Sequence, residues 1–440
     1  MSLEPQSQDL DQTDWVVYVV TERLKRVSLN EEQTWKKRCV YRVPAFDADL
    51  NHKAYQPQVV SFGPYHHGED HLRPMEEHKH RALLHFLERS KKPLRAFLES
   101  LREVARDLEE CYDALGPKWK DGGGDGAAGR FLELMFTDGC FMLEILRTAT
   151  RAVDDYAPDD PIFSNHGKLY IMQYIRRDML MLENQLPMLV LDRLVAVESD
   201  GEKDIEFINR LILNFCSPST SITRMGNCLH VLDVFRKSML MKPKMKVQHE
   251  LGNAGHDDGE EIIQSVTELN EAGILFKKST TDSLEDISFS NGVLRLPVIV
   301  VDNTTESMFL NLLAFERFHI RAGREVTSYL FFMGTIIDDE RDVMLLHARG
   351  IIQNAIGSDK EVAKLFKSLA KDGILEPDSS LYAVHKKVSN YCKMPLHKCR
   401  ANLIHIYSSN LYVALSVMAA IFLFVLTIIQ TVYSVLSYYQ

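Results

Sequence analysis

FLELMFTDGCFMLEILR, residues 131 to 147, is apolar on most faces of a helix, and so is YIMQYIRRDMLMLENQLPMLVLDRLV, residues 170 to 195. Helices with apolar side chains all round are normally buried, so these two segments predict the centre of a helical domain. An unpaired carboxylate there would be costly, which favours interhelical ion pairs over catalytic carboxylates. The acids concerned are Glu133, Asp138, Glu144, Asp178 and Glu183, and the bases available to them are Arg147, Arg176 and Arg177.

Helical periodicity continues on both sides of this centre. A helix is expected over residues 75–90, directly after Pro74, and apolar residues recur at three- and four-residue steps from Leu94 to Leu115. Further helices are expected from about Thr305, over residues 338–347 and over residues 361–369. The body of the chain is therefore predicted to be mainly helical.

Strand-like alternation is confined to one region, with GILFKK at 273–278, DISFS at 286–290 and VLRLPVIVV at 293–301. Asn291-Gly292 separates the last two segments and is a strong hairpin signal. The predicted fold class is mainly α, a multi-helix globular body with a small antiparallel β-hairpin or sheet near 273–301 and one C-terminal transmembrane helix.

The expected domain organisation follows from these patterns. Residues 1–39 form an N-terminal helix and lead-in, with Asp14 as the N-cap and without the positive charge of a cleaved export signal. Residues 40–400 form the helical body, a transmembrane helix covers 411–432, and 433–440 are a short tail. The glycine-rich residues 118–130 and the polar residues 242–261 are expected to be flexible inserts.

The C-terminal segment predicts membrane insertion. Residues 401–440 contain no Asp, Glu, Lys or Arg. The apolar stretch from Leu411 to Ile429 would span roughly 28 Å as a helix, close to the thickness of the bilayer's hydrocarbon core. The residues expected to contact lipid are Leu411, Val413, Leu415, Ile421, Phe422, Phe424 and Ile429.

The charges before this stretch predict its orientation. The upstream bases Lys386, Lys387, Lys393, Lys398 and Arg400 occur without an intervening acid, which favours a cytoplasmic body. The expectation is a single-pass protein with a C-terminal anchor, inserted after synthesis into the plasma membrane or an endomembrane.

Composition narrows the possible partners. The 440 residues carry a net charge of -10, so there is no basic footprint for nucleic acid. The 7 cysteines are scattered without a C-x-x-C pair, which fits a reducing compartment. The expected partners are the lipid bilayer and an unidentified protein.

Residues 40–79 are dense in Pro, Gly, His and Tyr and predict an ordered loop rather than a regular element. This segment resembles the plant family called domain of unknown function 247, through AYQPQVVSFGPYHHG (residues 54–68) and MEEHK (residues 75–79). Further matches run from Asp138 to Glu144, Leu182 to Pro187, Ala272 to Phe276 and Asn311 to Glu316, and the C-terminal hydrophobic helix is similar too.

The resemblance implies a membrane protein without an established activity, and some members act in grass self-incompatibility. It suggests recognition or signalling, with the stiff loop and adjacent helix as the candidate binding site. The residues proposed to form that site are Tyr65, His66, His67, Glu76 and Lys79.

The alternative is a membrane-tethered enzyme, with metal assistance as one option, that uses the His66/His67 loop with a carboxylate such as Glu76. His66, His67, His71, His78 and His80 are close in sequence, but no H-E-x-x-H pair is present. A G-x-S-x-G elbow and a G-K-[ST] phosphate loop are absent as well. The sequence therefore predicts no enzyme, no metal site and no cofactor.

Overall fold

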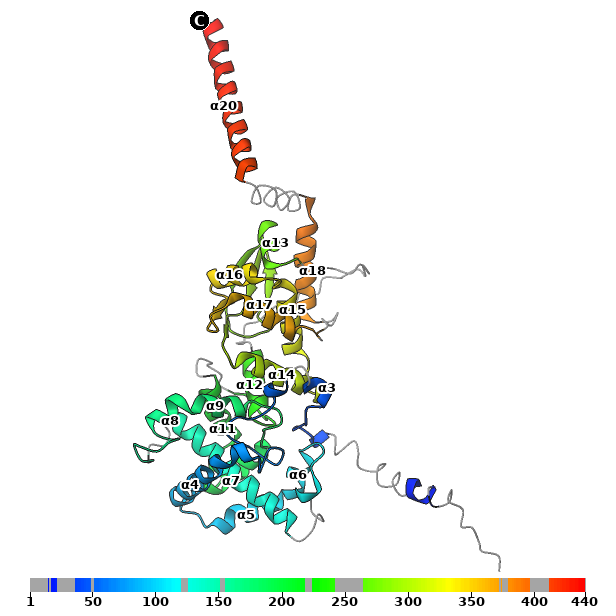
Figure 1. Cartoon of the computed structure of the whole chain (residues 1–440), viewed down its shortest axis with the longest axis vertical. Coiled ribbons are helices and arrows are strands. Elements are labelled where there is room, and N and C mark those ends of the chain that lie inside the picture. Colours follow the sequence, from blue (N-terminus) through cyan, green and yellow to red (C-terminus); the bar gives the residue numbers. More distant parts are fainter. Residues whose placement is uncertain are drawn as a thin grey trace, which may run out of the picture. The chain divides into compact units, whose positions relative to one another are not determined.

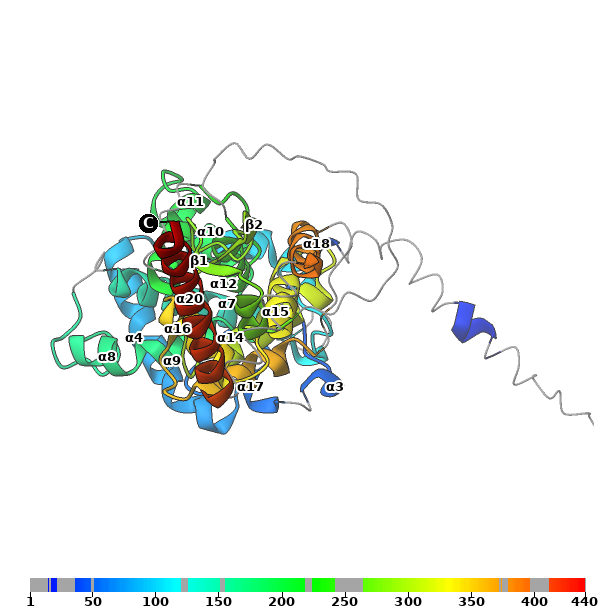
Figure 2. The ribbon, with the colours of Figure 1, turned by 90° about the horizontal axis from the view of Figure 1, so that it is seen from above.

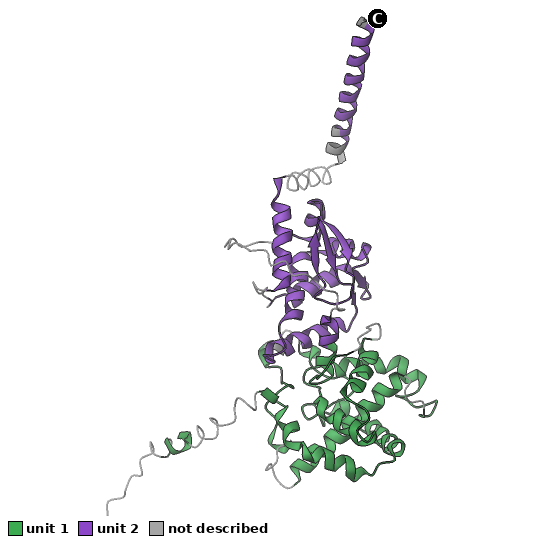
Figure 3. Cartoon of the chain, turned by 180° about the vertical axis from the view of Figure 1, so that it is seen from behind, with its two compact units in different colours: residues 1–235 green, residues 236–440 purple. Residues whose placement is uncertain are grey.

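The computed structural model describes residues 15, 17–21, 36–48, 51–119, 126–150, 155–217, 224–241, 264–371, 373, 379–395 and 411–439. Within them the protein is mostly helical with small sheets, as predicted. The chain divides into two compact units, Met1–Phe235 and Arg236–Gln440 (Figure 3). The predicted inserts and N-terminus fall partly outside the described residues, including Asp14 and all of 242–261.

Helix α7 (Ala127–Ala149) is the centre of the first unit (Figure 1). It contacts α4 (Arg73–Ser90), α5 (Leu94–Glu103), α10 (Met188–Glu198) and α11 (Ile205–Cys216). Nearly every side chain from Phe131 to Thr148 is buried, as expected for a helix that is apolar all round. The helix begins within the predicted glycine-rich insert, since residues 127–130 are helical.

The remaining elements of the first unit are short. They are α3 (Ala45–Ala48), η1 (His52–Ala54), η2 (Asp70–Leu72), α6 (Ala105–Glu110), η3 (Pro117–Trp119), α8 (Asn165–Tyr170) and α9 (Met172–Met179). Helix α12 (Val231–Leu240) contains the boundary between the units.

Two segments expected as single helices are interrupted. The stretch from Leu94 to Leu115 breaks at Val104, and α6 ends where the Cys111 carbonyl accepts N–H groups from residues 39 and 40. The stretch 170–195 breaks between α9 and α10. There the Gln185 amide donates to the carbonyls of Met179 and Met181, which replaces helical hydrogen bonds.

The second unit combines small sheets with helices. Strands β1 (Leu275–Lys278), β2 (Ser288–Ser290) and β3 (Val293–Leu296) form one sheet in the order β1-β3-β2. Strand β4 (Ile299–Val301) pairs in parallel with β5 (Ile352–Asn354). The described helices are α13 (Val266–Glu271), α14 (Thr305–Phe318), α15 (Glu325–Ile336), α16 (Glu340–Ala348), α17 (Asp359–Leu369), α18 (Ser380–Lys393) and α20 (Leu411–Tyr439).

The predicted hairpin is present, but the sheet around it is not wholly antiparallel. Strands β2 and β3 are antiparallel, and both Asn291 (φ 49°) and Gly292 (φ 72°) adopt the left-handed conformation that a tight hairpin needs. Strand β1 instead pairs in parallel with β3. Pro297 has no N–H to donate, so β3 ends before it and 299–301 join a different sheet.

Helix α20 is long and apolar enough to cross a membrane, and no other helix among the described residues meets that condition. Its most apolar part is Met418–Ser437, with a mean hydropathy of 2.2, and none of that part is buried. The predicted lipid contacts Leu415, Ile421, Phe422, Phe424 and Ile429 are exposed. The apolar segment therefore extends beyond the predicted end at residue 432, and helix continues through most of the predicted tail.

Candidate functional site

Two buried side chains bind the backbone of the predicted binding loop. Asp178, at the end of α9, accepts backbone N–H groups from Gln58 (3.0 Å), Val59 (2.7 Å) and Val60 (3.1 Å). Asn184 accepts the N–H of Phe62 at 2.6 Å and donates to the carbonyl of Val60 at 3.0 Å. These contacts satisfy backbone groups that a loop without regular structure would otherwise leave unpaired.

A buried ion pair fixes the next part of the loop. The Lys79 ammonium lies 2.7 Å from an Asp138 oxygen, and neither side chain is exposed. Asp138 also accepts the N–H of Gly63 at 2.8 Å, and Lys79 reaches Glu76 at 2.7 Å and the Ser61 hydroxyl at 3.2 Å. Burial raises the pKa of Asp138, although the nearby Lys79 acts in the opposite direction. Lys79 thus joins α4 to α7 beneath the loop.

Tyr65 is also part of this framework. Its hydroxyl donates to the carbonyl oxygen of Asp113, and its ring packs edge-on against Tyr112 with the centroids 5.6 Å apart. Gly63 has φ +74°, and a Cβ there would lie 2.8 Å from the Tyr112 hydroxyl oxygen. The turn therefore requires glycine both for its backbone angle and for its space.

The two adjacent histidines have different surroundings. The buried His66 ring lies between two carboxylates, with Nδ1 2.8 Å from Glu69 and Nε2 3.4 Å from Glu183. Burial opposes protonation, but the two glutamates outweigh it and raise the pKa of His66. His67 is half-buried with its ring against Trp119.

Four of the five predicted site residues therefore fall into two groups. Glu76 and Lys79 meet at one end of the loop, and Tyr65 and His66 lie at the other, where their side chains are buried and bonded. Only His67 and Glu76 retain half-exposed side chains. No group of three or more His, Cys, Asp or Glu placed to hold a metal ion occurs among the residues that the structure describes.

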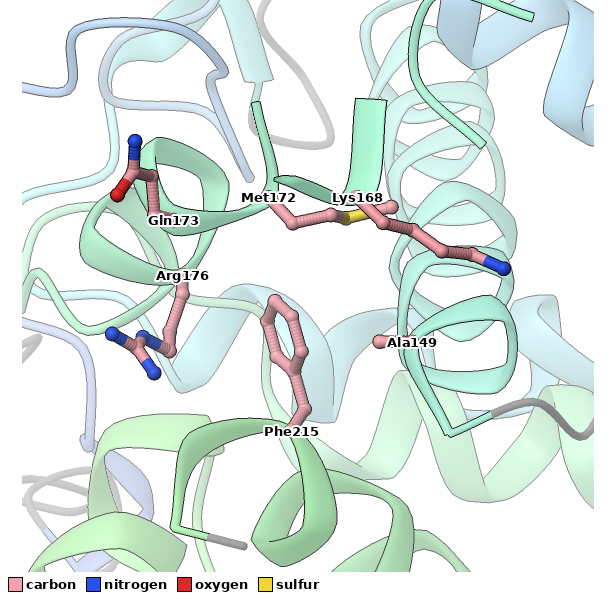
Figure 4. A pocket seen from close by; sticks show the side chains of 6 residues that line it. All are labelled: Ala149, Lys168, Met172, Gln173, Arg176 and Phe215. Atoms are coloured by element: carbon pink, nitrogen blue, oxygen red, sulfur yellow. The ribbon is translucent and has the colours of Figure 1, made fainter. Parts of the chain in front are cut away.

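A pocket lies elsewhere in the first unit, between the end of α7, the helices α8 and α9, and the end of α11. It has a volume of about 240 Å³ and is lined by Ala149, Lys168, Met172, Gln173, Arg176 and Phe215. Figure 4 shows the Phe215 ring standing in the space between the other side chains, with Lys168 and Arg176 on opposite sides.

The surface around this pocket is apolar and cationic. Leu169, Tyr170 and Tyr174 are 67%, 52% and 44% exposed, and α8 lies at the edge of the first unit in both Figure 1 and Figure 2. No acidic side chain pairs with Lys168 or Arg176 within the described ranges. Sequence reasoning missed this surface because it assigned residues 170–195 to the core. The available signal was KLYIMQYIRR, residues 168–177, where bases and tyrosines occur without an acid.

Comparison with known proteins identifies the family of this chain. Residues 40–426 match the profile of DUF247, described as a plant protein of unknown function. The chain belongs to this family. It is 32% identical over 433 residues to the UPF0481 protein At3g47200 of Arabidopsis thaliana, with 91% of this chain and 87% of the relative covered. It is 21% identical to the putative UPF0481 protein At3g02645 of the same plant, with 96% and 94% covered. No solved structure matches the chain.

The motifs that resemble DUF247 supply the contacts described above. Asp138 and Asn184 hold the loop, and Glu144 accepts from Arg89 at 2.6 Å and from the Tyr156 hydroxyl at 2.7 Å. In the second unit Glu316 bonds Arg236 at 2.9 Å and accepts the N–H of Val326 at 3.0 Å. In this DUF247 chain the motif residues thus act as buried connectors between segments far apart in sequence.

Proposed function

We propose that this DUF247 protein is a membrane-anchored recognition protein, held in the bilayer by α20 and binding an acidic protein segment on its α8–α9 surface. We define the α8–α9 surface as Lys168, Leu169, Tyr170, Tyr174 and Arg176 together with the pocket beside them. The observation that carries the proposal is the combination of exposed apolar side chains with two cations that lack acidic partners in the described structure. The proposal assigns no catalytic step.

The anchor is supported by the length and composition of α20. The most apolar part of α20, the 20 uncharged residues Met418–Ser437, has a mean hydropathy of 2.2 and matches the hydrocarbon core of a bilayer in length. The bases from Lys386 to Arg400 precede it, and the positive-inside rule then favours a cytoplasmic body. The expected location is the plasma membrane or an endomembrane, with the recognition units facing the cytosol.

The size and chemistry of the pocket favour a peptide side chain over a small-molecule ligand. Typical small-molecule sites measure roughly 300–1,000 Å³, and this pocket of about 240 Å³ is smaller. One large apolar side chain would contact Phe215 and Met172, and flanking acids would meet Lys168 and Arg176. Tyrosine and arginine are also enriched where proteins bind one another.

Selection from a peptide library tests the proposal. The full-length protein, reconstituted in lipid nanodiscs, should enrich acidic peptides that carry one large apolar residue. Lys168→Glu and Arg176→Glu should each weaken such a peptide roughly tenfold or more, since hydrogen bonds to charged groups contribute about 1.5–3 kcal/mol. Lys364→Glu makes the same charge change on an exposed position of α17 and should leave binding unchanged.

Three outcomes contradict the proposal. Enriched peptides without acidic bias, or equal binding by Lys168→Glu and Lys364→Glu, would remove the role of the α8–α9 surface. Loss of binding to anionic lipid vesicles in Lys168→Glu, without any peptide preference in the wild type, would reassign the surface to the membrane.

A further inference from the structure

Two cysteines of the first unit lie side by side although they are far apart in sequence. Val40 and Tyr112 form a parallel β-bridge, which places the preceding residues, Cys39 and Cys111, next to each other. The Cys111 carbonyl accepts the N–H of Cys39 at 2.9 Å and that of Val40 at 3.0 Å. These two bonds hold the backbones of the cysteines in direct contact, which is the proximity that a disulfide between them requires.

The two side chains differ in their exposure to solvent. Both cysteines are unbridged in the structure. Cys39 is 2% exposed, whereas Cys111 is partly exposed. The neighbouring Cys111 side chain, together with burial, raises the pKa of the Cys39 thiol. Of the two cysteines, Cys111 is therefore the more exposed residue.

The surrounding contacts hold this pair in place. The carbonyl of Cys39 bonds the buried His230 ring at 3.0 Å, and the Asp113 N–H donates to the Val40 carbonyl at 2.9 Å. Because the backbone is fixed on both sides, rotation of the two side chains is the movement needed to bring the sulfurs to a disulfide distance of about 2.05 Å.

We propose that Cys39 and Cys111 form a reversible redox site that closes to a disulfide by exchange with a low-molecular-weight disulfide such as oxidised glutathione. The Cys111 thiolate attacks one glutathione sulfur, forms a mixed disulfide and releases one glutathione thiolate, which takes up a proton. The Cys39 thiol then loses its proton and attacks the Cys111 sulfur, releasing the second glutathione. Two protein thiols lose two electrons and two protons, and one glutathione disulfide becomes two thiols.

The bridge would tie the lead-in at residue 39 to the end of α6 and enclose the candidate loop and α4–α6. Cross-links that close long loops restrict the unfolded chain most, so oxidation should raise the melting temperature of the first unit by roughly 5–10 °C. Since disulfides persist in oxidising compartments and are rare in the cytosol, the pair would be reduced under ordinary conditions in a cytoplasmic body.

Peptide mapping of the full-length protein in detergent tests the site. The wild type is equilibrated with excess oxidised glutathione, unfolded in the presence of N-ethylmaleimide so that buried thiols are also alkylated, and digested without reductant. The expected result is a peptide pair linked through Cys39 and Cys111, the loss of two alkylated thiols and the higher melting temperature. Reduced glutathione should reverse all three changes.

Matched variants separate this site from general cysteine oxidation. Cys111→Ser should lose both the linked peptide and the thermal shift, whereas Cys392→Ser, which changes another partly exposed cysteine, should keep both. Alkylation of both Cys39 and Cys111 after oxidation, or a bridge from either to a different cysteine, would overturn the proposal. The wild-type mapping decides this even if a variant fails to fold.

Discussion

Replacing Lys79 by methionine should strongly destabilise the first unit. Methionine keeps an unbranched apolar chain of similar length, so little cavity is created, and the main loss is the ammonium that faces Asp138 at 2.7 Å. Breaking a buried ion pair by removing one partner costs about 3–5 kcal/mol, because the remaining charge has no compensation. Asp138 is fully buried, and Glu76 is a second nearby carboxylate that would no longer be neutralised.

The double variant Lys79→Met/Asp138→Leu should be less destabilised than Lys79→Met alone. The double variant has no unpaired carboxylate at position 138. It leaves one buried donor without an acceptor, the N–H of Gly63, which Asp138 accepts at 2.8 Å in the wild type. An unsatisfied buried donor costs about 1–3 kcal/mol. The unfolding free energy should therefore be highest for the wild type, lower for the double variant and lowest for the single variant.

The penalty of Lys79→Met should also depend on pH. Burial raises the folded-state pKa of Asp138, and removal of Lys79 takes away the opposing charge, so the carboxyl is expected to protonate more readily in the variant. A group with a raised folded pKa contributes stability that is present at low pH and lost as the pH rises through that pKa. The variant should therefore recover stability as the pH is lowered from 7.5 to 5.

Urea denaturation of the full-length proteins in detergent, followed by fluorescence of the buried Trp119, measures these free energies. A cost below about 1 kcal/mol for Lys79→Met would show that the pair does not hold the loop. A double variant less stable than the single one would refute the explanation that the unpaired Asp138 carboxylate destabilises Lys79→Met.

Three further predictions concern other parts of the molecule. Gly63→Ala should cost at least about 1–3 kcal/mol in thermal denaturation, because its left-handed backbone and a contact of 2.8 Å both oppose a Cβ; Gly68→Ala has the same backbone strain without a close contact and should cost less. Leu423→Arg at the middle of α20 should shift the protein from the membrane fraction to the soluble fraction, whereas Ser437→Arg at the end of the apolar part should not, since a central arginine costs about 2.5–3.5 kcal/mol. The stability contributed by His66 should be fully present below pH 6.5 and lost as the pH rises through its raised pKa. The unfolding free energy of His66→Gln should therefore fall less than that of the wild type between pH 6 and 8. An unchanged pH profile would contradict the role of the two glutamates beside His66.

Features with a local physical cause were predictable from the sequence. The periodicity of 131–147 predicted the buried centre of α7, and Asn291-Gly292 predicted the tight turn between β2 and β3, whose positive φ angles suit these residues. The charge-free C-terminus likewise predicted a helix long and apolar enough to cross a membrane. Each of these signals depends on residues that are close together in the chain.

The partners of the buried charges were only partly predictable. The expectation that the acids of the central helices would be paired is met for Asp138 and Glu144, but Asp138 pairs with Lys79 of α4 rather than with an arginine. Asp178 is satisfied mainly by backbone N–H groups of the loop. The sequence shows that a buried carboxylate needs a partner, but several bases and N–H groups meet that need equally well until the chain is folded.

For the candidate binding residues as well, the sequence indicates an ordered segment but not which side chains are buried. Composition identified residues 40–79 as an ordered and unusual segment, and the structure shows why its loop is ordered. Whether a given side chain in that segment faces water or the core depends on α7, α9 and the turn before α10, which supply Asp138, Asp178 and Asn184 from positions more than 70 residues away.

The sequence by itself determined the helical class, the apolar C-terminal helix, the hairpin turn and membership of the plant family, because periodicity, hydropathy and motif order are properties of neighbouring residues. Only the tertiary structure decided that Lys79 and Tyr65 are buried connectors, that β1 runs parallel to β3, and that Cys39 lies beside Cys111. These arrangements depend on which distant segments pack together, and that choice is made by the burial of whole helices rather than by any short stretch of the chain.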